Sequence, residues 1–297
     1  MKKAITIVNR QTGELMPETV MGDGALRFAY ETFLGHCLSG LLFNSSGLSA
    51  LMGWYYDRAL SRRNIGALAS IPGCNASEAE FPPEKYSSFN DFFTRRLKEG
   101  ARPFELAADL LSSPADGRIT VFEGLTGESP VPVKGAERTL NDLCCEKLTA
   151  PRLAAAVIRL APVDYHRYHF PCECFQAKEP LKVKGKYHSV NPVALAKYPD
   201  LYVENTRQIT ALESELFGAF RFLEVGAFGV GSIVQSAAPG KHRKQDEKGY
   251  FKFGGSTIIL IFDNDKIKWS PDLLENSAKG YETLIRCGET IAGAVKA

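Results

Sequence analysis

The stretch Lys248–Phe262, KGYFKFGGSTIILIF, decides how this chain folds. Its second half, Ser256–Phe262, is a run of β-branched and large apolar residues, which predicts a buried strand. Gly254 and Gly255 stand directly before Ser256, and paired glycines let the backbone adopt conformations closed to other residues and let another group approach closely. A β-bulge or tight turn explains this pair without any function. Alternatively, the pair has a function, because the Gly255–Ser256 peptide bond is itself reactive.

Short β-rich runs bounded by Gly and Pro continue this pattern from about residue 111 onwards. We therefore predict the α+β class, with a mainly antiparallel β catalytic domain over residues 106–297. No GxGxxG or GxxxxGK[ST] motif opens a helix, so a nucleotide-binding α/β fold has no support. The expected strands include Arg118–Phe122, Leu181–Lys186, Phe222–Val225 and Ser256–Phe262, and the expected helices lie near Leu140–Cys145 and Leu273–Ile285.

Composition places the chain among ordinary globular proteins. It has 297 residues, of which 44% are apolar and 24% charged, and its formal net charge is only +2. This near balance removes the usual reason to expect nucleic acid as a partner. The seven cysteines have no CxxC pairing, and the apolar start of the chain is too short for a signal peptide. We expect free thiols in a reducing cytoplasm.

An uncharged, aromatic-rich stretch from Thr32 to Tyr56 lies in an N-terminal region, residues 1–105, that we predict to be largely helical. A turn sequence at 44–47, Asn-Ser-Ser-Gly, divides the stretch into two short helices rather than one membrane span. Aromatic residues beside a basic cluster are typical of a membrane-docking helix, and a buried helical hairpin explains the same residues. The docking residues would be Trp54, Tyr55, Arg58, Arg62 and Arg63.

The segment SSFNDFFTRRLKEGARP at 87–103 closes this region with one more predicted helix. Ser88 with Asp91 resembles a capping box, and apolar residues from Phe89 to Leu97 recur at helical spacing.

Two of the five histidines, His166 and His169, lie three residues apart in LAPVDYHRYHFP. The spacing leaves three explanations open. They could join His188 in a metal site, although the Glu of HExxH is missing. They could be hydrogen-bonded core residues, or one could be a general base oriented by a carboxylate. Asp116, in SPADG, is by itself an ordinary turn residue.

From about Phe89 to its end the chain resembles the phosphatidylserine decarboxylase proenzymes. One departure is Gly254, where many members of that family have Leu, and it leaves the Gly-Ser pair intact. The resemblance rests on FFTRRLKEGARP, SPADG, LAPVDYHRYHFP, YHSVNP, LYVENTR, VGAFGVGSI and GYFKFGGST, which follow one another in the family's order.

The resemblance implies a self-processing enzyme. The chain would cleave itself between Gly255 and Ser256 into a β chain, 1–255, and an α chain, 256–297, and Ser256 would become a pyruvoyl group. By the same resemblance, His169 is the base for self-cleavage, Asp116 orients His169, and His166 is the candidate proton donor in decarboxylation. Neither a metal nor pyridoxal phosphate is expected as a cofactor.

The implied reaction converts phosphatidylserine in a membrane into phosphatidylethanolamine and CO2, in phospholipid biosynthesis. The expected location is peripheral, on the cytoplasmic face of the cell membrane, with a homodimer left open as the assembly. A basic loop at 241–244 could attract anionic lipid, or could simply be solvated. Rival interpretations are a pyruvoyl decarboxylase of a soluble amino acid, a Ser-His-Asp esterase lacking the GxSxG elbow, and a non-enzymatic binding module.

Overall fold

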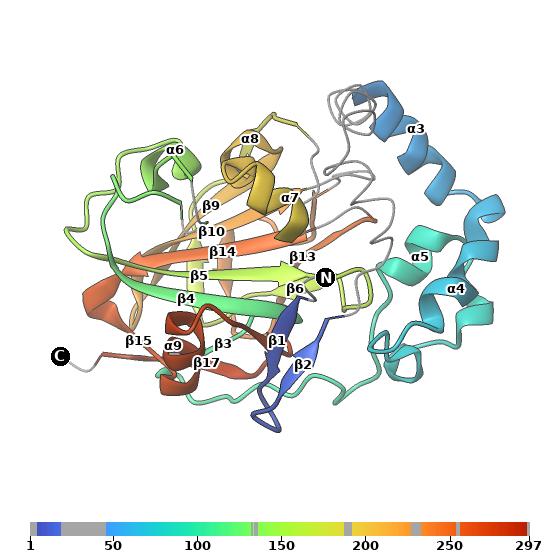
Figure 1. The fold of residues 1–297 in the computed structure, drawn as a ribbon, viewed down its shortest axis with the longest axis horizontal. Helices are drawn as coiled ribbons and strands as arrows, with labels where there is room; N and C mark the ends of the chain where they lie inside the picture. The colour runs from blue at the N-terminus through green and yellow to red at the C-terminus, as the bar shows by residue number, and fades with distance from the viewer. Residues whose placement is uncertain are drawn as a thin grey trace.

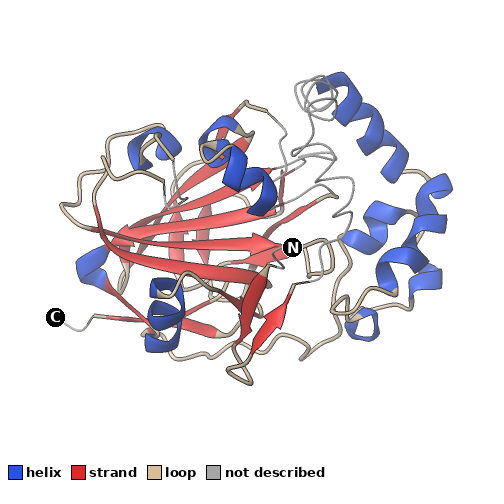
Figure 2. Cartoon of the chain, viewed as in Figure 1, coloured by secondary structure: helices blue, strands red, loops and turns tan. Residues whose placement is uncertain are grey.

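The computed structural model describes residues 5–18, 46–131, 133, 136–186, 192–226, 233–253 and 256–295 (Figure 1). Its architecture is α+β, with mostly antiparallel sheets and short helices (Figure 2), and this confirms the predicted class. Across the described ranges, no helix combines the length and the apolar character needed to cross a bilayer.

The large sheet has eleven strands in the order β12-β7-β9-β10-β14-β5-β4-β16-β1-β2, with β8 beside β9. The predicted strand at Ser256 is confirmed as β14, Ser256–Asp263, which lies between antiparallel β10 and β5. Parallel pairing occurs between β1 and β16. The other strands are β1 (Thr6–Asn9), β2 (Leu15–Pro17), β4 (Gly117–Leu125), β5 (Leu153–Leu160), β7 (Cys174–Gln176), β8 (Leu181–Val183), β9 (Arg207–Ser214), β10 (Gly218–Gly226), β12 (Gly240–His242) and β16 (Glu282–Ile285).

Two three-stranded sheets complete the β structure. One has the order β11-β13-β6 and the other β15-β17-β3. A large apolar core that includes Phe222, Phe262 and Trp269 packs between the sheets. Residues 252–255 connect β13, in one of the small sheets, to β14, in the large sheet. The bounds are β3 (Leu110–Ser112), β6 (Arg167–His169), β11 (Ile233–Gln235), β13 (Glu247–Phe251), β15 (Ile267–Trp269) and β17 (Thr290–Ala294).

Short helices from the N-terminal region gather at one side of the sheets, at the right of Figure 1. They are α3 (Ser46–Tyr56), η1 (Ala59–Asn64), α4 (Ile65–Ala69), η2 (Ala76–Glu78), η3 (Pro83–Lys85) and α5 (Phe89–Phe93). The remaining helices are α6 (Leu140–Cys144), α7 (Pro192–Lys197), α8 (Leu201–Glu204), η4 (Asn264–Lys266) and α9 (Pro271–Ala278). The helical group and the β-rich part share a small core in which Phe89 and Phe93 pack with Val163.

Several observed element boundaries differ from the predicted ones. The Ser88 hydroxyl caps α5, as predicted, while Asp91 accepts from Ser87 rather than closing the capping box. The helix ends at Phe93, and Leu97 pairs with Ala79 in an isolated β-bridge. The predicted helix Leu273–Ile285 is confirmed only in its first part. Helix α9 ends at Ala278, Gly280 adopts a positive φ of 80°, and the chain continues as β16.

The predicted helical region 1–105 does not begin as a helix. Residues 6–17 form the hairpin β1–β2, which extends the large sheet through β16. The first half of the predicted docking hairpin, residues 32–45, lies outside the described residues. Its second half is helix α3, which begins at Ser46 in the predicted turn.

Candidate functional site

Ser256 is a fully buried serine at the start of β14, where it lies opposite Gly226 on one side and Leu160 on the other. Its hydroxyl has no hydrogen-bond partner among the described residues. A buried hydroxyl without a partner costs about 1–3 kcal/mol, so its presence at this position points to a use other than stability. Gly255, its expected reaction partner, lies outside the described residues.

His166 lies in the segment between β5 and β6, beside the end of β13. Its main-chain carbonyl accepts a hydrogen bond from the Phe251 N–H at 2.9 Å, and its ring packs on Phe93 with centroids 3.9 Å apart. Its Nδ1 lies 3.0 Å from the Asp164 main-chain oxygen. Because a carbonyl only accepts, Nδ1 carries the proton and Nε2 holds a lone pair.

The His166 ring is held neutral in this environment. Burial lowers the pKa of His166 to about 3, and the Asp164 carbonyl opposes this only in part. Its Nε2, like the Ser256 hydroxyl, is buried without a partner among the described residues. The carboxylate of Asp164 accepts from Arg118 and from the Ala161 N–H, which fixes the carbonyl that orients His166.

His169 ends strand β6 with both ring nitrogens engaged. Its Nδ1 donates to the Gln245 main-chain oxygen at 2.8 Å, and its Nε2 accepts from the Tyr165 hydroxyl at 3.0 Å. Burial lowers the pKa of His169, so the neutral ring with a lone pair on Nε2 is favoured. This is the form that a general base requires.

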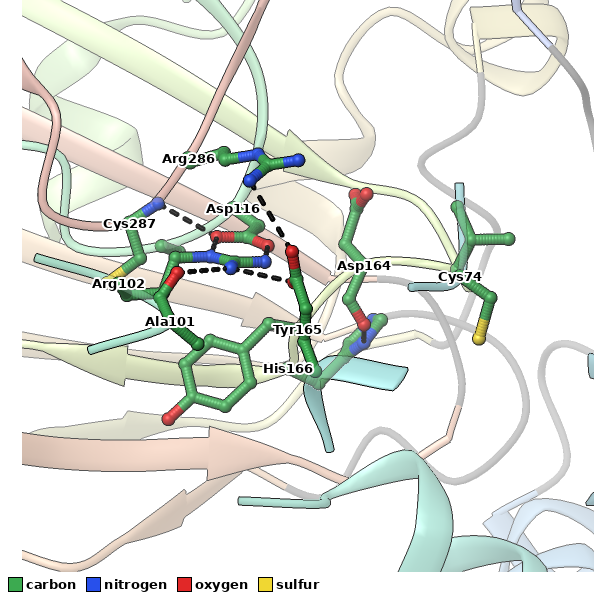
Figure 3. Close-up of polar contacts among 12 residues, drawn as sticks. Cys74, Ala101, Arg102, Asp116, Asp164, Tyr165, His166, Arg286 and Cys287 are labelled. Carbon is green, nitrogen blue, oxygen red and sulfur yellow. Dashed lines mark hydrogen bonds and ion pairs between the residues drawn. The ribbon is translucent and has the colours of Figure 1, made fainter. Parts of the chain in front are cut away.

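Asp116 is buried and held by three hydrogen bonds (Figure 3). The Arg102 guanidinium donates to both of its oxygens, at 2.8 and 2.6 Å, and the Cys287 N–H donates to Oδ1 at 2.8 Å. The hydrogen bond that sets the His169 tautomer is the one that Nδ1 donates to the Gln245 main-chain oxygen. Asp116 acts on His169 through space, where its charge raises the pKa of that ring. Its orienting role stays a prediction.

Two cavities of about 530 and 710 Å³ share His169, Gln245 and Glu247 in their walls. Tyr165 and Arg102 line the smaller of the two. Volumes of this size suit a small-molecule group rather than a single water. A third, apolar cavity of about 370 Å³ lies beside Phe253, among residues of α3, α4 and α5.

Some members of the site were missed by the sequence analysis. Asp164 and Tyr165 stand directly before His166, so their position in the motif was a usable signal. Arg102 lies in another motif, but nothing in the sequence pairs it with Asp116. Gln245 acts through its main-chain oxygen, from a residue with φ of 84°, and such a contact leaves no sequence signal.

Within the described ranges, no group of three or more metal-ligating side chains lies together. His188, the third ligand of the metal explanation, lies outside those ranges. The six described cysteines are free thiols. Lys244, in the basic loop, donates to three main-chain oxygens, those of Glu105, Ala107 and Leu110, so its charge serves the fold.

The predicted docking residues lie on or next to the exposed end of α3. Trp54 is 54% exposed, and the Arg58 guanidinium lies 5.0 Å from the centre of its ring. Arg63 reaches the Tyr55 hydroxyl at 3.4 Å, and Arg62 donates to a main-chain oxygen of η3. The aromatic and basic groups therefore share one surface.

Comparison with known proteins gives one family. The family model described as phosphatidylserine decarboxylase matches residues 89–293. A phosphatidylserine decarboxylase proenzyme of Ruminiclostridium cellulolyticum is 38% identical over 98% of both chains. Proenzymes with the same name are 40% identical in Desulfitobacterium hafniense, over 97% of both chains, and in Clostridium botulinum, over 97% of this chain and 98% of that protein.

Proposed function

The chain belongs to the phosphatidylserine decarboxylase family, and from this membership we infer that it is a proenzyme whose processed form converts phosphatidylserine into phosphatidylethanolamine and CO2. The observation that carries the catalytic assignment is the buried hydroxyl of Ser256 at the start of β14, which has no hydrogen-bond partner in the described part of the chain. No metal or external cofactor is part of the proposal.

We propose that Ser256 supplies the catalytic carbonyl by self-cleavage. Its Oγ attacks the Gly255 carbonyl, and the amide becomes an ester after the proton moves to nitrogen. Removal of the α-proton of Ser256 expels the Gly255 carboxylate and leaves dehydroalanine, which takes up water and loses ammonia. The resulting pyruvoyl carbonyl supplies the electron sink for loss of CO2 from an amine substrate. That no described residue hydrogen-bonds Oγ fits this use.

The proposed base for the first step is His169. A serine hydroxyl is a weak nucleophile and needs a neutral acceptor. His169 has its lone pair on Nε2, where the Tyr165 hydroxyl now donates, and its lowered pKa keeps that nitrogen unprotonated at neutral pH. Asp116 would stabilise the imidazolium electrostatically once His169 has taken the proton.

His166 is proposed to handle the proton of decarboxylation. Its Nε2 is unprotonated and buried, so it must first take up a proton and then deliver it to the former α-carbon of the substrate. A buried imidazolium with so low a pKa is a strong acid, which favours that delivery.

Peripheral attachment to the cytoplasmic face of the cell membrane is proposed for the surface around α3. Exposed Trp54 beside Arg58 is a pairing suited to the headgroup layer, with the ring at the interface and the cation toward anionic lipid. The apolar cavity beside Phe253 opens among the same helices.

The test is release of CO2 from carboxyl-labelled phosphatidylserine in vesicles, with the Ser256→Ala variant as control. The proposal predicts release by the parent, none by the variant, and none from free serine. Release from free serine at the vesicle rate would favour a decarboxylase of a soluble amino acid. Ester hydrolysis without CO2 release would favour an esterase.

A further inference from the structure

The residues just before the Gly255–Ser256 bond are held by the N-terminal helices rather than by strand pairing. Strand β13 ends at Phe251, and the next two residues contact Asp57, which directly follows α3, and Asn90 of α5. The Phe253 N–H donates to Asn90 Oδ1 at 2.9 Å, and Lys252 Nζ lies 2.8 Å from Asp57 Oδ2. Asn90 Nδ2 donates to Asp57 Oδ1 at 2.9 Å, which joins the two contacts into one bridge.

An aromatic cage encloses the same residue. The Phe253 ring lies 4.8 Å from Tyr56, 4.9 Å from Phe89 and 5.2 Å from Phe93, centre to centre, in edge-on arrangements. Phe93 also stacks on His166. The cage therefore links the segment before the cleavage site to one of the catalytic histidines. Phe89 and Phe93 are buried, so the cage is a fixed surface rather than a loose contact.

Position 90 requires a side chain that both accepts and donates a hydrogen bond, which few residues can do. It accepts a hydrogen bond from Phe253 and donates one to Asp57, and a primary amide is the group that does both at once. Asn90 is only 3% exposed, so an unpaired group on its side chain would be costly.

We propose that Asn90, Asp57 and the aromatic cage are positioning residues for self-cleavage. The proposal rests on the self-cleavage proposed above. Attack by a hydroxyl on a neighbouring carbonyl needs the two atoms about 3–3.5 Å apart and aligned, and a misplacement of about 1 Å costs on the order of a hundredfold in rate. Ser256 is fixed by β14, whereas the chain on the other side of the bond is fixed at Phe253 from α5. The helices would thereby position the chain two residues before the Gly255 carbonyl that the serine attacks.

The bridge also has a role after cleavage. The new end of the β chain would lie at Gly255, two residues beyond Phe253, with no covalent link to β14. The Asn90 bridge and the cage would keep Phe253, two residues before this end, beside Phe93, which packs on His166. The helical region would then serve the reaction as well as the membrane contact.

The test is a timed synthesis of the full chain, quenched in denaturant, in which the precursor and the two products are followed by mass. Asn90→Ala is expected to lengthen the half-time of cleavage at least about tenfold. Asn90→Asp alone is expected to be as slow, because it places two carboxylates against each other. Asn90→Asp with Asp57→Asn restores one acceptor and one donor in exchanged positions and is expected to return the half-time to within about threefold of the parent.

Asn64→Ala is the matched control. It removes the same group from the same helical region, where Asn64 hydrogen-bonds the Tyr55 hydroxyl and lines the cavity beside Phe253 without being part of the Asn90–Asp57 bridge, and it is expected to cleave at the parental rate. Cleavage of Asn90→Ala at the parental rate would overturn the inference. An exchange variant as slow as Asn90→Ala would also overturn it, because the slower cleavage would then not result from the loss of the bridge. A parent chain that never cleaves would instead reject the proposed self-cleavage.

Discussion

Lys248→Met should destabilise the fold strongly, because Lys248 and Glu224 form an ion pair that is completely buried. Lys248 Nζ lies 2.5 Å from Glu224 Oε1, and it also donates to Thr210 at 2.9 Å and to Gln235 at 3.0 Å. The pair joins β13, which lies beside the strand of His169, to β10, which lies beside the strand of Ser256. Loss of this ion pair should loosen the connection between β13 and β10, and so between the strands that carry His169 and Ser256.

The magnitude follows from the charge left behind. Removing one partner of a buried pair costs about 3–5 kcal/mol of unfolding free energy, since the other charge stays buried and uncompensated. Lys248→Met with Glu224→Leu removes both charges and should recover most of this loss. The assay is urea unfolding in a Ser256→Ala background, in which the proposal predicts a single chain and hence a defined two-state reference.

The loss should also depend on pH. Burial raises the pKa of Glu224 above its ordinary value, and the loss of Lys248 removes the main opposing charge. A group whose pKa is raised on folding lowers stability as pH rises, so the deficit of Lys248→Met should be larger at about pH 8 than at about pH 5.5. A deficit below about 1 kcal/mol, or one equal at both pH values, would refute this reasoning.

Three further predictions concern the proposed roles. His169→Ala should remain a single chain, and a processed variant would reject the assignment. In the parent, the cleavage rate should stay constant as the pH falls to about 6.5, because the pKa of His169 is lowered. A rate that already falls from about pH 7 would also reject the assignment. His166→Ala should cleave but release no CO2 from phosphatidylserine, so normal turnover would remove it from the mechanism. Replacing Trp54 and Tyr55 with Ser should weaken co-sedimentation with anionic liposomes and leave cleavage intact; unchanged binding would count against docking at α3.

The parts of the fold that could be predicted are those in which one pattern dominates locally. The apolar run of β14 has a single reasonable outcome, and the Ser88 cap marks the start of α5. The prediction of one helix over 273–285 failed because the apolar spacing suits a helix throughout, whereas Gly280 ends the helix. The hairpin β1–β2 depends on pairing with β16, about 270 residues away along the chain, which no local pattern reveals.

The site divides in the same way. Ser256 and the two histidines could be proposed from the motifs that resemble the family, and their roles stay predictions; the structure shows Ser256 buried at the start of β14 and His166 buried beside Phe251. The partners of those residues could not be named. Asp116 is held by Arg102, fourteen positions earlier, and His169 by a main-chain oxygen. Such contacts depend on the three-dimensional path of the chain rather than on residue type.

The central claim, that Ser256 becomes the catalytic carbonyl by cleavage of the chain, is tested most directly by intact mass under denaturing conditions. The account predicts two chains of 255 and 42 residues, since 297 − 255 = 42. The smaller should be lighter by one ammonia than a peptide that starts with serine. A single chain of 297 residues with an unmodified Ser256, in a preparation that releases CO2 from phosphatidylserine, would contradict the account.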